Sequence, residues 1–184
     1  MNKKVIITGG CGDIGFAIGK FFQSKEFEVV LTGIDEDEIN SRPKIENITY
    51  ELLDVTSDES VKTLIKKHDN FHVLVNAAGN VMREKEFEIN NFANVVDVHL
   101  NGTYRMCSNS VDILSKNKGS IVNFSSMLAF FGGKLSPAYS SAKGGISQLT
   151  KSLAINYASK NVRVNAVAPG WIATKMTDAL RSSE

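Results

Sequence analysis

The chain has 184 residues, 42% of them hydrophobic, so we expect one domain, residues 1–184, with its own apolar core. A formal net charge of +1 gives no reason to expect nucleic acid or an anionic membrane as a partner. The two cysteines make no disulfide framework, no Cys/His cluster has metal-site spacing, and no apolar run is long enough to span a bilayer. The apolar run at the N-terminus is also too short for a signal peptide, so we expect a cytoplasmic protein.

The first segments predict a dinucleotide-binding loop. Residues 3–8 are typical of a strand, residues 16–22 have the apolar spacing of a helix, and the glycines between them fit G-x-G-x-x-G. Glycines allow the main chain to approach a pyrophosphate closely, and the beginning of a helix offers free N–H groups. We therefore predict cofactor binding here rather than a plain glycine turn, with contacts from Gly9, Gly12, Asp13, Ile14 and Gly15.

The second predicted strand, residues 28–32, ends where such a fold meets the adenosine ribose. Asp35 lies twenty residues after Gly15, which is the separation expected for a ribose-binding carboxylate. A carboxylate accepts hydrogen bonds from both ribose hydroxyls but repels a 2′-phosphate, so Asp35 favours NAD(H). NADP(H) stays possible, because Arg42 is close enough in the sequence to fold back and reverse the preference. We expect Glu36 to Glu38 to form a solvated loop.

The remaining segments alternate between strand and helix patterns. Strands are predicted at residues 48–52, 71–75, 119–126 and 162–167, and helices at 57–67, across 87–114, and from about 139 to 160. This alternation predicts an α/β fold, a Rossmann-type doubly wound parallel β-sheet with helices on both faces. Ligands of such sheets bind beyond the carboxyl ends of the strands, and the candidate residues fall at that edge.

Tyr139 and Lys143 are four residues apart in the last predicted helix, so both side chains lie on one face of it. A tyrosine titrates near ~10 in water, and a neighbouring positive charge favours the phenolate and lowers that pKa. The pair is therefore a candidate general acid/base. Most pairs with this spacing are ordinary surface residues, so the assignment depends on the rest of the chain.

In joint order and spacing, these motifs resemble the short-chain dehydrogenases/reductases, and the resemblance covers the whole chain. The motifs are the glycine loop, Asp54, Asn76-Ala77-Ala78-Gly79, Ser126, Tyr139-x-x-x-Lys143 and Pro169-Gly170-x-x-x-Thr174. The resemblance implies that Tyr139 is the catalytic acid/base, that Lys143 lowers its pKa and holds the nicotinamide ribose, and that Ser126 orients the substrate carbonyl.

The same resemblance implies further contacts and partners. Additional cofactor contacts are expected from Asp54, Val55, Asn76, Ala77, Ala78, Gly79, Pro169, Gly170, Ile172 and Thr174. The substrate would be a small carbonyl compound or alcohol, and reduction of 3-oxoacyl thioesters is a common activity of similar proteins. Members of the family commonly form homodimers or homotetramers, and we expect the same here.

Three departures from the family pattern bear on these expectations. Asp13 stands where the family usually has a glycine, and its carboxylate would lie close to the cofactor phosphates unless it points away. His99 stands where an asparagine often serves a proton relay, so it is either an altered relay or a packed side chain, and Asn101 is the nearest other relay candidate. The chain also ends before the family's last strand, so we expect the final strand to be missing.

Two classes of function stay open. An active oxidoreductase would transfer hydride between a nicotinamide dinucleotide and a carbonyl or secondary alcohol, and the presence of Ser126, Tyr139 and Lys143 favours it. A dinucleotide-binding module without turnover, acting in binding or redox sensing, is favoured by Asp13 and the short C-terminus.

Overall fold

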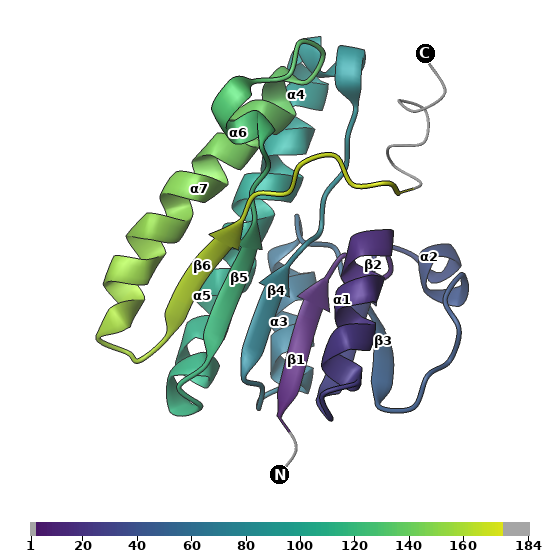
Figure 1. The fold of residues 1–184 in the computed structure, drawn as a ribbon, viewed down its shortest axis with the longest axis vertical. Helices are drawn as coiled ribbons and strands as arrows, with labels where there is room; N and C mark the ends of the chain where they lie inside the picture. Colours follow the sequence, from purple (N-terminus) through teal and green to yellow (C-terminus); the bar gives the residue numbers. More distant parts are fainter. Residues whose placement is uncertain (1–2, 175–184) are drawn as a thin grey trace.

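Residues 3–174 are described by the computed structural model, and they form a six-stranded sheet in the order β3-β2-β1-β4-β5-β6 (Figure 1). Every pair of neighbouring strands is parallel. This order confirms the predicted Rossmann-type sheet, with strand order reversing between β1 and β4. The strands are β1 (Lys4–Thr8), β2 (Glu28–Gly33), β3 (Ile48–Leu52), β4 (Val73–Asn76), β5 (Ser120–Phe124) and β6 (Arg163–Val167).

Helices cover both faces of the sheet, and each face has its own core. One core joins strand residues to side chains of α3 (Asp58–Lys67), α5 (Gly102–Lys116) and α7 (Pro137–Ala158). The other lies under α1 (Asp13–Gln23), in front of the sheet in Figure 1. Val5, Ile6 and Ile7 of the central strand β1 are completely buried, because a strand covered on both faces must be apolar on both.

The segment between β4 and α5 is an interrupted helix. It consists of a 3₁₀ turn η1 (Arg83–Phe87), helix α4 (Ile89–Val96) and a π-helical turn η2 (Asp97–Asn101) that continues into α5. The sequence predicted one or two helices across this region, and the π turn was not foreseen. The extra residue of a π turn rotates the side chains that follow it, and such turns frequently occur at functional sites. His99 lies on this turn.

Two short helices were also not predicted. Glu36 to Glu38 begin α2 (Glu36–Asn40) instead of forming the expected loop, although Glu36 and Asp37 are exposed as expected. The Asp35 side chain caps this helix by accepting a 2.8 Å hydrogen bond from the Glu38 N–H, and the acidic first turn suits the positive end of the helix dipole. Helix α6 (Leu128–Phe131) follows β5 and lies beside the beginning of α7.

Among residues 3–174, no helix has both the length and the apolar character needed to cross a membrane, and no group of His, Cys, Asp or Glu side chains is arranged to hold a metal.

Candidate active site

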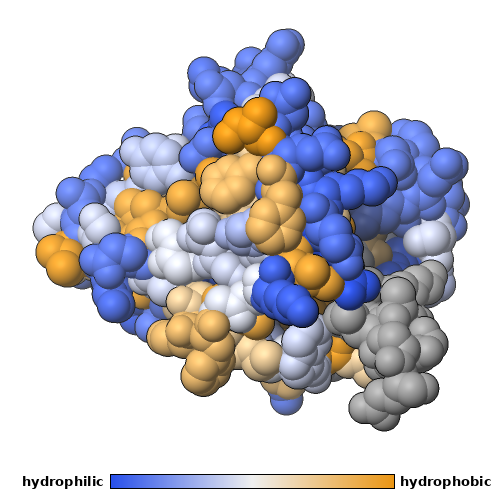
Figure 2. All heavy atoms as spheres, turned by 90° about the horizontal axis from the view of Figure 1, so that it is seen from above, coloured by the Kyte–Doolittle hydropathy of each residue, from blue (hydrophilic) through white to orange (hydrophobic). Residues whose placement is uncertain are grey.

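A cleft of about 740 Å³ opens at the carboxyl ends of the strands. This end of the molecule faces the viewer in Figure 2, where apolar and polar side chains alternate over the surface. Most of the predicted site residues line the cleft, namely Gly9, Gly12, Asp13, Ile14, Gly15, Ala77, Gly79, His99, Ser126, Tyr139, Lys143, Pro169, Gly170, Ile172 and Thr174. Asp35, Asp54, Val55, Asn76 and Ala78 do not line it.

The glycine loop packs its main chain directly against the segment after β4. Gly9 has a φ of +61°, and a Cβ atom there would lie 2.7 Å from the Ala78 Cα. A Cβ atom on Gly15 would overlap the Gly9 carbonyl oxygen. The Thr8 hydroxyl accepts a 3.1 Å hydrogen bond from the Ala78 N–H and joins the two segments. Glycine is therefore required at both positions, and the cleft floor at this point is main chain, as a bound pyrophosphate requires.

Arg42 folds back onto the glycine loop, which is the alternative that kept NADP(H) open in the sequence analysis. Its Nε donates a 2.6 Å hydrogen bond to the Cys11 carbonyl, and its guanidinium lies 2.9 Å from the Asp13 carboxylate and 4.7 Å from the Phe16 ring centre. The carboxylate of Asp13 therefore has a cationic partner. It does not cap α1, because Asp13 is the first helical residue and Gly12 occupies the cap position.

The carboxylate nearest the end of β2 in the cleft belongs to Glu38, not to Asp35. Glu38 accepts a 2.9 Å hydrogen bond from the Ile34 N–H and lines the cleft. Asp35 is engaged in capping α2 and lies outside the cleft lining. Because α2 forms here, Glu38 lies in the cleft where Asp35 was expected. The expected ribose contact of Asp35 therefore has no support in this geometry.

Three other predicted cofactor residues have internal roles. The Asp54 carboxylate accepts hydrogen bonds from the Thr56 N–H and hydroxyl, at 2.8 and 2.7 Å. Asn76 is buried and donates a 2.9 Å hydrogen bond to Asn123, so it connects β4 to β5. Val55 is buried, and its side chain occupies the space that a Cβ atom on Gly102 would need. These residues shape the sheet edge below the cleft.

Tyr139, Lys143 and Ser126 converge on one wall of the cleft. The Lys143 amine lies 5.4 Å from the Tyr139 ring centre and donates a 2.6 Å hydrogen bond to the Phe124 carbonyl at the end of β5. The Ser126 hydroxyl accepts a 3.2 Å hydrogen bond from the Leu128 N–H, so α6 sets its position. Strand β5 and helix α7 together bring the three side chains to the same place, as the sequence predicted.

The protonation equilibria of this wall are dominated by burial. Burial raises the pKa of Tyr139, a hydrogen bond with Ser126 lowers it, and the Glu86 charge raises it. The expected net lowering by Lys143 is therefore not met, because removal of a phenolate from water is the larger effect. Burial also lowers the pKa of Lys143 to about 7.

His99 is buried beside this wall, with its ring edge-on to Tyr139 at 5.1 Å between centres. Its Nε2 lies 2.7 Å from the Asn80 carbonyl oxygen, and its Nδ1 has no hydrogen-bond partner among the described residues. Burial, and then the Lys143 charge, lower the pKa of His99 to about 3, so the ring is neutral at pH 7. Asn101 is exposed and donates to Asp97, so the geometry favours His99 over Asn101 as the side chain close to Tyr139.

The family model for short chain dehydrogenases matches residues 3–184. The chain belongs to the short-chain dehydrogenases/reductases. Members of this family are oxidoreductases that use nicotinamide dinucleotides, and this confirms the resemblance predicted from the sequence.

Named relatives in this family include enzymes with different substrates. The chain is 34% identical to the 3-oxoacyl-[acyl-carrier-protein] reductase FabG of Chlamydia pneumoniae, an alignment covering 100% of this chain and 79% of the relative. It is 31% identical to the 2-dehydro-3-deoxy-D-gluconate 5-dehydrogenase of Bacillus subtilis, covering 100% of this chain and 76% of the relative.

Solved structures of similar proteins have the same fold. The structure described as ElxO with NADP bound is 32% identical to this chain and superposes with a TM-score of 0.89, covering 100% of this chain and 81% of ElxO. An apo SCOR enzyme from Clostridium thermocellum is 35% identical, with a TM-score of 0.88, covering 95% of this chain and 74% of that enzyme.

The sequence did not predict the roles of two acidic side chains, Glu38 in the lining of the cleft and Glu86 in the interior beside the Tyr139 main chain. The sequence predicts a solvated loop at Glu38 and assigns no role to Glu86. Glu86 is completely buried and accepts a 3.0 Å hydrogen bond from the Tyr139 N–H. It stands in a run of charged residues, 83–86, that is typical of an exposed turn. No local pattern in the sequence distinguishes it from its exposed neighbours.

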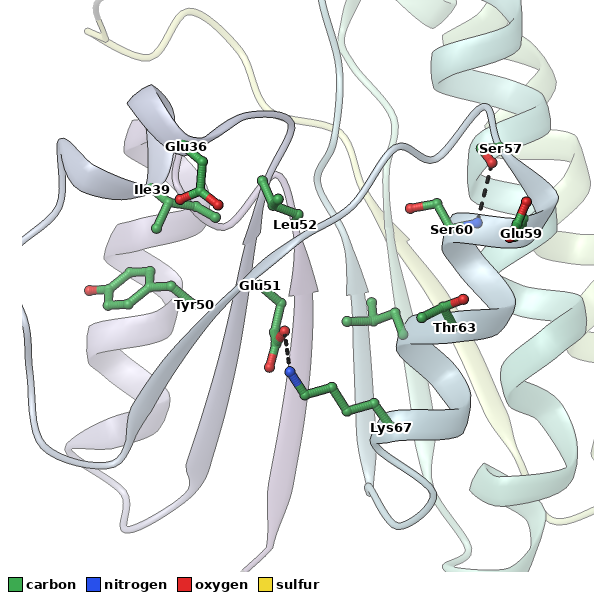
Figure 3. Close-up of a pocket in the computed structure, with 11 residues that line it drawn as sticks. Glu36, Ile39, Tyr50, Glu51, Leu52, Ser57, Glu59, Ser60, Thr63 and Lys67 are labelled. Atoms are coloured by element: carbon green, nitrogen blue, oxygen red, sulfur yellow. Dashed lines mark hydrogen bonds and ion pairs between the residues drawn. The ribbon is translucent and has the colours of Figure 1, made fainter.

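A second cavity of about 600 Å³ lies between β3 and α3 (Figure 3). Glu51 points from β3 toward Lys67 of α3, and the two form a 2.8 Å ion pair across the cavity. His68 lies 3.4 Å from the other oxygen of the same carboxylate. None of the predicted site residues lines this cavity, so it lies outside the candidate active site.

Proposed function

We propose that this protein transfers hydride between a nicotinamide dinucleotide and a carbonyl or secondary alcohol, with Tyr139 as the general acid/base. The observation that carries this proposal is the convergence of Ser126, Tyr139 and Lys143 on one wall of a cleft whose floor is the glycine loop. A binding module would need the glycine loop alone, whereas a proton-transfer reaction needs a titratable group beside the reacting carbonyl.

The residues of the cleft fit a dinucleotide. The glycine loop and the beginning of α1 present main-chain N–H groups where a pyrophosphate would bind. Lys143 and the segment from Pro169 to Thr174, which also lines the cleft, would hold the nicotinamide end. When bound, the cofactor supplies or accepts the hydride, and the protein supplies binding, orientation and proton transfer.

The side chains on the wall that carries Tyr139 have different roles in proton transfer. Ser126 would donate a hydrogen bond to the substrate carbonyl oxygen, and Tyr139 would give that oxygen its proton during reduction, or remove it during oxidation. The positive charge of Lys143 stabilises the phenolate that remains. His99, neutral and bonded to the Asn80 carbonyl, would connect this wall to proton exchange with solvent in place of the usual asparagine.

The cofactor preference rests on Glu38 and Arg42 in this proposal. The NAD(H) preference expected from Asp35 is not supported, because Asp35 caps α2 and the similar protein ElxO is described with NADP bound. Glu38 would disfavour a 2′-phosphate by charge repulsion, and Arg42 would favour it as a cationic partner. The two side chains therefore act in opposite directions on the choice between NAD(H) and NADP(H).

The cleft lining includes several large apolar side chains. Met127, Leu128, Leu135 and Trp171 are among them, and this composition suits a carbonyl carried on an apolar chain. A 3-oxoacyl compound is therefore the first substrate class to test, and the named function of the Chlamydia relative adds to its support. A homo-oligomeric state and a cytoplasmic location stay predictions.

The non-catalytic alternative loses one of its two reasons, since Asp13 is paired with Arg42. The test is a titration of the protein with NADH and NADPH, followed by Trp171 fluorescence, and an assay of ethyl acetoacetate and a panel of other ketones and aldehydes. Saturable oxidation of NADH or NADPH that depends on the ketone supports the enzyme. Tight cofactor binding without turnover of any panel member supports the binding module.

A further inference from the structure

Glu86 is a carboxylate with no solvent exposure, and it accepts three main-chain hydrogen bonds. One oxygen accepts from the N–H groups of Met82 and Arg83, at 3.3 and 3.2 Å, which closes the η1 turn. The other oxygen accepts from the N–H group of Tyr139, at 3.0 Å. The carboxylate thus joins the segment after β4 to the first turn of α7, 53 residues away in the sequence.

The bond to Tyr139 replaces the local cap of α7. Helix α7 begins at Pro137, so Tyr139 is its third residue, and a cap side chain normally accepts a hydrogen bond from the N–H of the second or third residue. Ser136 occupies the cap position and is a favourable residue type, yet its side chain makes no capping bond. The helix that carries Tyr139 and Lys143 is therefore capped by a side chain from a different segment.

This arrangement places a buried negative charge next to the main chain of the proposed acid/base. The side chains that surround Tyr139 are Lys143 on α7, His99 on η2, Ser126 after β5 and Glu86 on η1. Glu86 is the only one of these four that is bonded to the backbone of Tyr139 rather than directed at its ring or hydroxyl. Movement of this carboxylate would displace the whole residue relative to Ser126.

We propose that Glu86 is a positioning residue for the reaction, which fixes the first turn of α7 so that the Tyr139 hydroxyl meets the substrate carbonyl beside Ser126. This inference rests on the proposed role of Tyr139. Small displacements of a reacting group are costly to rate, since about 1 Å can change it by about a hundredfold. The Glu86 charge also opposes formation of the Tyr139 phenolate, so Glu86 acts on both the place and the acidity of the phenol.

The test compares Glu86→Gln with Ser57→Ala. Ser57 caps α3 through a 3.2 Å hydrogen bond from the Ser60 N–H, outside the candidate active site, so its loss is a matched removal of a helix cap. We expect Glu86→Gln to lower kcat for ethyl acetoacetate by about ten- to a hundredfold. The dissociation constant of the dinucleotide should stay within about twofold, since Glu86 is not part of the glycine loop. Ser57→Ala should lower the melting temperature and leave kcat unchanged.

A second readout does not require turnover. The absorbance change on ionisation of Tyr139 is obtained as the difference between a protein and its Tyr139→Phe counterpart, and it should occur at lower pH in Glu86→Gln than in the wild type. A Glu86→Gln protein with wild-type kcat and an unchanged Tyr139 titration, but a lower melting temperature, would overturn the proposal and leave the proposed function standing.

The two proposals also fail differently. If Tyr139→Phe keeps the wild-type rate, the proposed function and the positioning role of Glu86 are both contradicted. The Tyr139 titration would then report only the electrostatic effect of Glu86 on the phenol. If Glu86→Gln does not fold, Glu86→Asp takes its place, since it keeps the buried charge but is one methylene too short for the Tyr139 N–H. The same loss of kcat is expected, and wild-type kcat in Glu86→Asp would contradict the proposal.

Discussion

The side-chain amine of Lys143 lies 5.4 Å from the centre of the Tyr139 ring, one helical turn further along α7. The same amine donates a 2.6 Å hydrogen bond to the main-chain carbonyl of Phe124 at the end of β5. The helix therefore sets the separation of the two side chains, and the strand fixes the direction of the amine. Because burial lowers the pKa of Lys143 to about 7, the charge beside Tyr139 changes within the physiological pH range.

Replacement of Tyr139 by phenylalanine tests the proton-transfer role directly. The ring and its packing against His99 are kept, and only the transferable proton is lost, so we expect kcat to fall by about 10²- to 10⁴-fold. The dissociation constant of the dinucleotide, measured by Trp171 fluorescence, should change by less than about twofold. Lys143→Ala should impair both quantities, because Lys143 is assigned to the phenol and to the nicotinamide ribose. A Tyr139→Phe protein with a near wild-type rate would show that the acid/base lies elsewhere.

Lys143 should also make the stability of the protein depend on pH. Its folded-state pKa of about 7 lies below the ordinary value of 10.5, so the unfolded chain binds more protons between these two values. The Lys143 contribution to stability is therefore fully present above about pH 10.5 and is lost as the pH falls through about 7. At pH 7 the cost of the buried charge is on the order of a few kcal/mol.

The comparison is with Lys143→Met, which keeps an unbranched side chain one atom shorter and removes the charge. In urea unfolding at pH 7, this variant should have a higher free energy of unfolding than the wild type. The gain should be reduced by about 1 kcal/mol, because the hydrogen bond to Phe124 is lost. The advantage should shrink at pH 9. A constant difference between the two proteins across this range would mean that Lys143 keeps its ordinary pKa in the folded protein.

The sequence predicts the elements whose signals are local. The strand at residues 48–52 and the helix capped by Ser57 have the predicted bounds, because alternation and a hydroxyl cap depend only on near neighbours. The glycine loop and the Tyr139–Lys143 pair were found for the same reason, since their chemistry requires fixed spacings in the chain.

The acidic residues show where sequence reasoning stops. Asp35, Glu38 and Glu86 all stand in charged runs that are typical of solvated turns, yet one caps a helix, one lines the cleft and one is completely buried. Burial of Glu86 is made tolerable by three main-chain N–H groups, and the one that ties it to the site, that of Tyr139, is 53 residues away in the sequence. Arg42 and Asp13 are likewise 29 residues apart in the sequence.

The glycine loop is tested by two alanine substitutions with opposite expectations. A Cβ atom on Gly15 would overlap the Gly9 carbonyl, so Gly15→Ala should displace the loop and weaken dinucleotide binding by at least about tenfold. Apart from its chain neighbours and the backbone of its own helix, the nearest atom to a Cβ on Gly144, in the interior of α7, would be the Ala129 carbonyl oxygen at 3.8 Å. Gly144→Ala should therefore leave binding unchanged and raise stability by up to about 1 kcal/mol. Equal dissociation constants for wild type and Gly15→Ala would remove the loop from the cofactor site.

His99 should make the protein sensitive to acid. Its folded-state pKa of about 3 lies below the ordinary 6.5, so the stability that depends on the neutral ring is complete above about pH 6.5 and is lost as the pH falls toward 3. His99→Asn removes this titration, and we expect its acid-unfolding midpoint, followed by circular dichroism, to lie at lower pH than that of the wild type. An identical midpoint would indicate that the ring reaches solvent.

The same position tests the proton relay by a different measurement. His99→Asn restores the residue type common in the family and should keep kcat within a few-fold of the wild type. His99→Leu fills the space beside Tyr139 without a proton-carrying group, and should lower kcat by about tenfold or more. Equal rates for the Leu and Asn variants would leave His99 with a packing role only.

The choice between NADH and NADPH should follow the charges of Arg42 and Glu38. Arg42 is held between the Cys11 carbonyl, Asp13 and the Phe16 ring, and its side chain is still 16% exposed, so a 2′-phosphate can compete with Asp13 for the guanidinium. Arg42→Ala should therefore weaken NADPH binding about tenfold relative to NADH, because a hydrogen bond to a charged group contributes about 1.5–3 kcal/mol.

Glu38→Gln should shift the ratio of dissociation constants toward NADPH, and Asp35→Asn should leave it unchanged, since Asp35 caps α2 away from the cleft. The measurements are paired dissociation constants at equal ionic strength. If the ratio of the two dissociation constants changed in Asp35→Asn but not in Arg42→Ala or Glu38→Gln, Asp35 would be the ribose contact. In that case α2 would have to unwind when the cofactor binds.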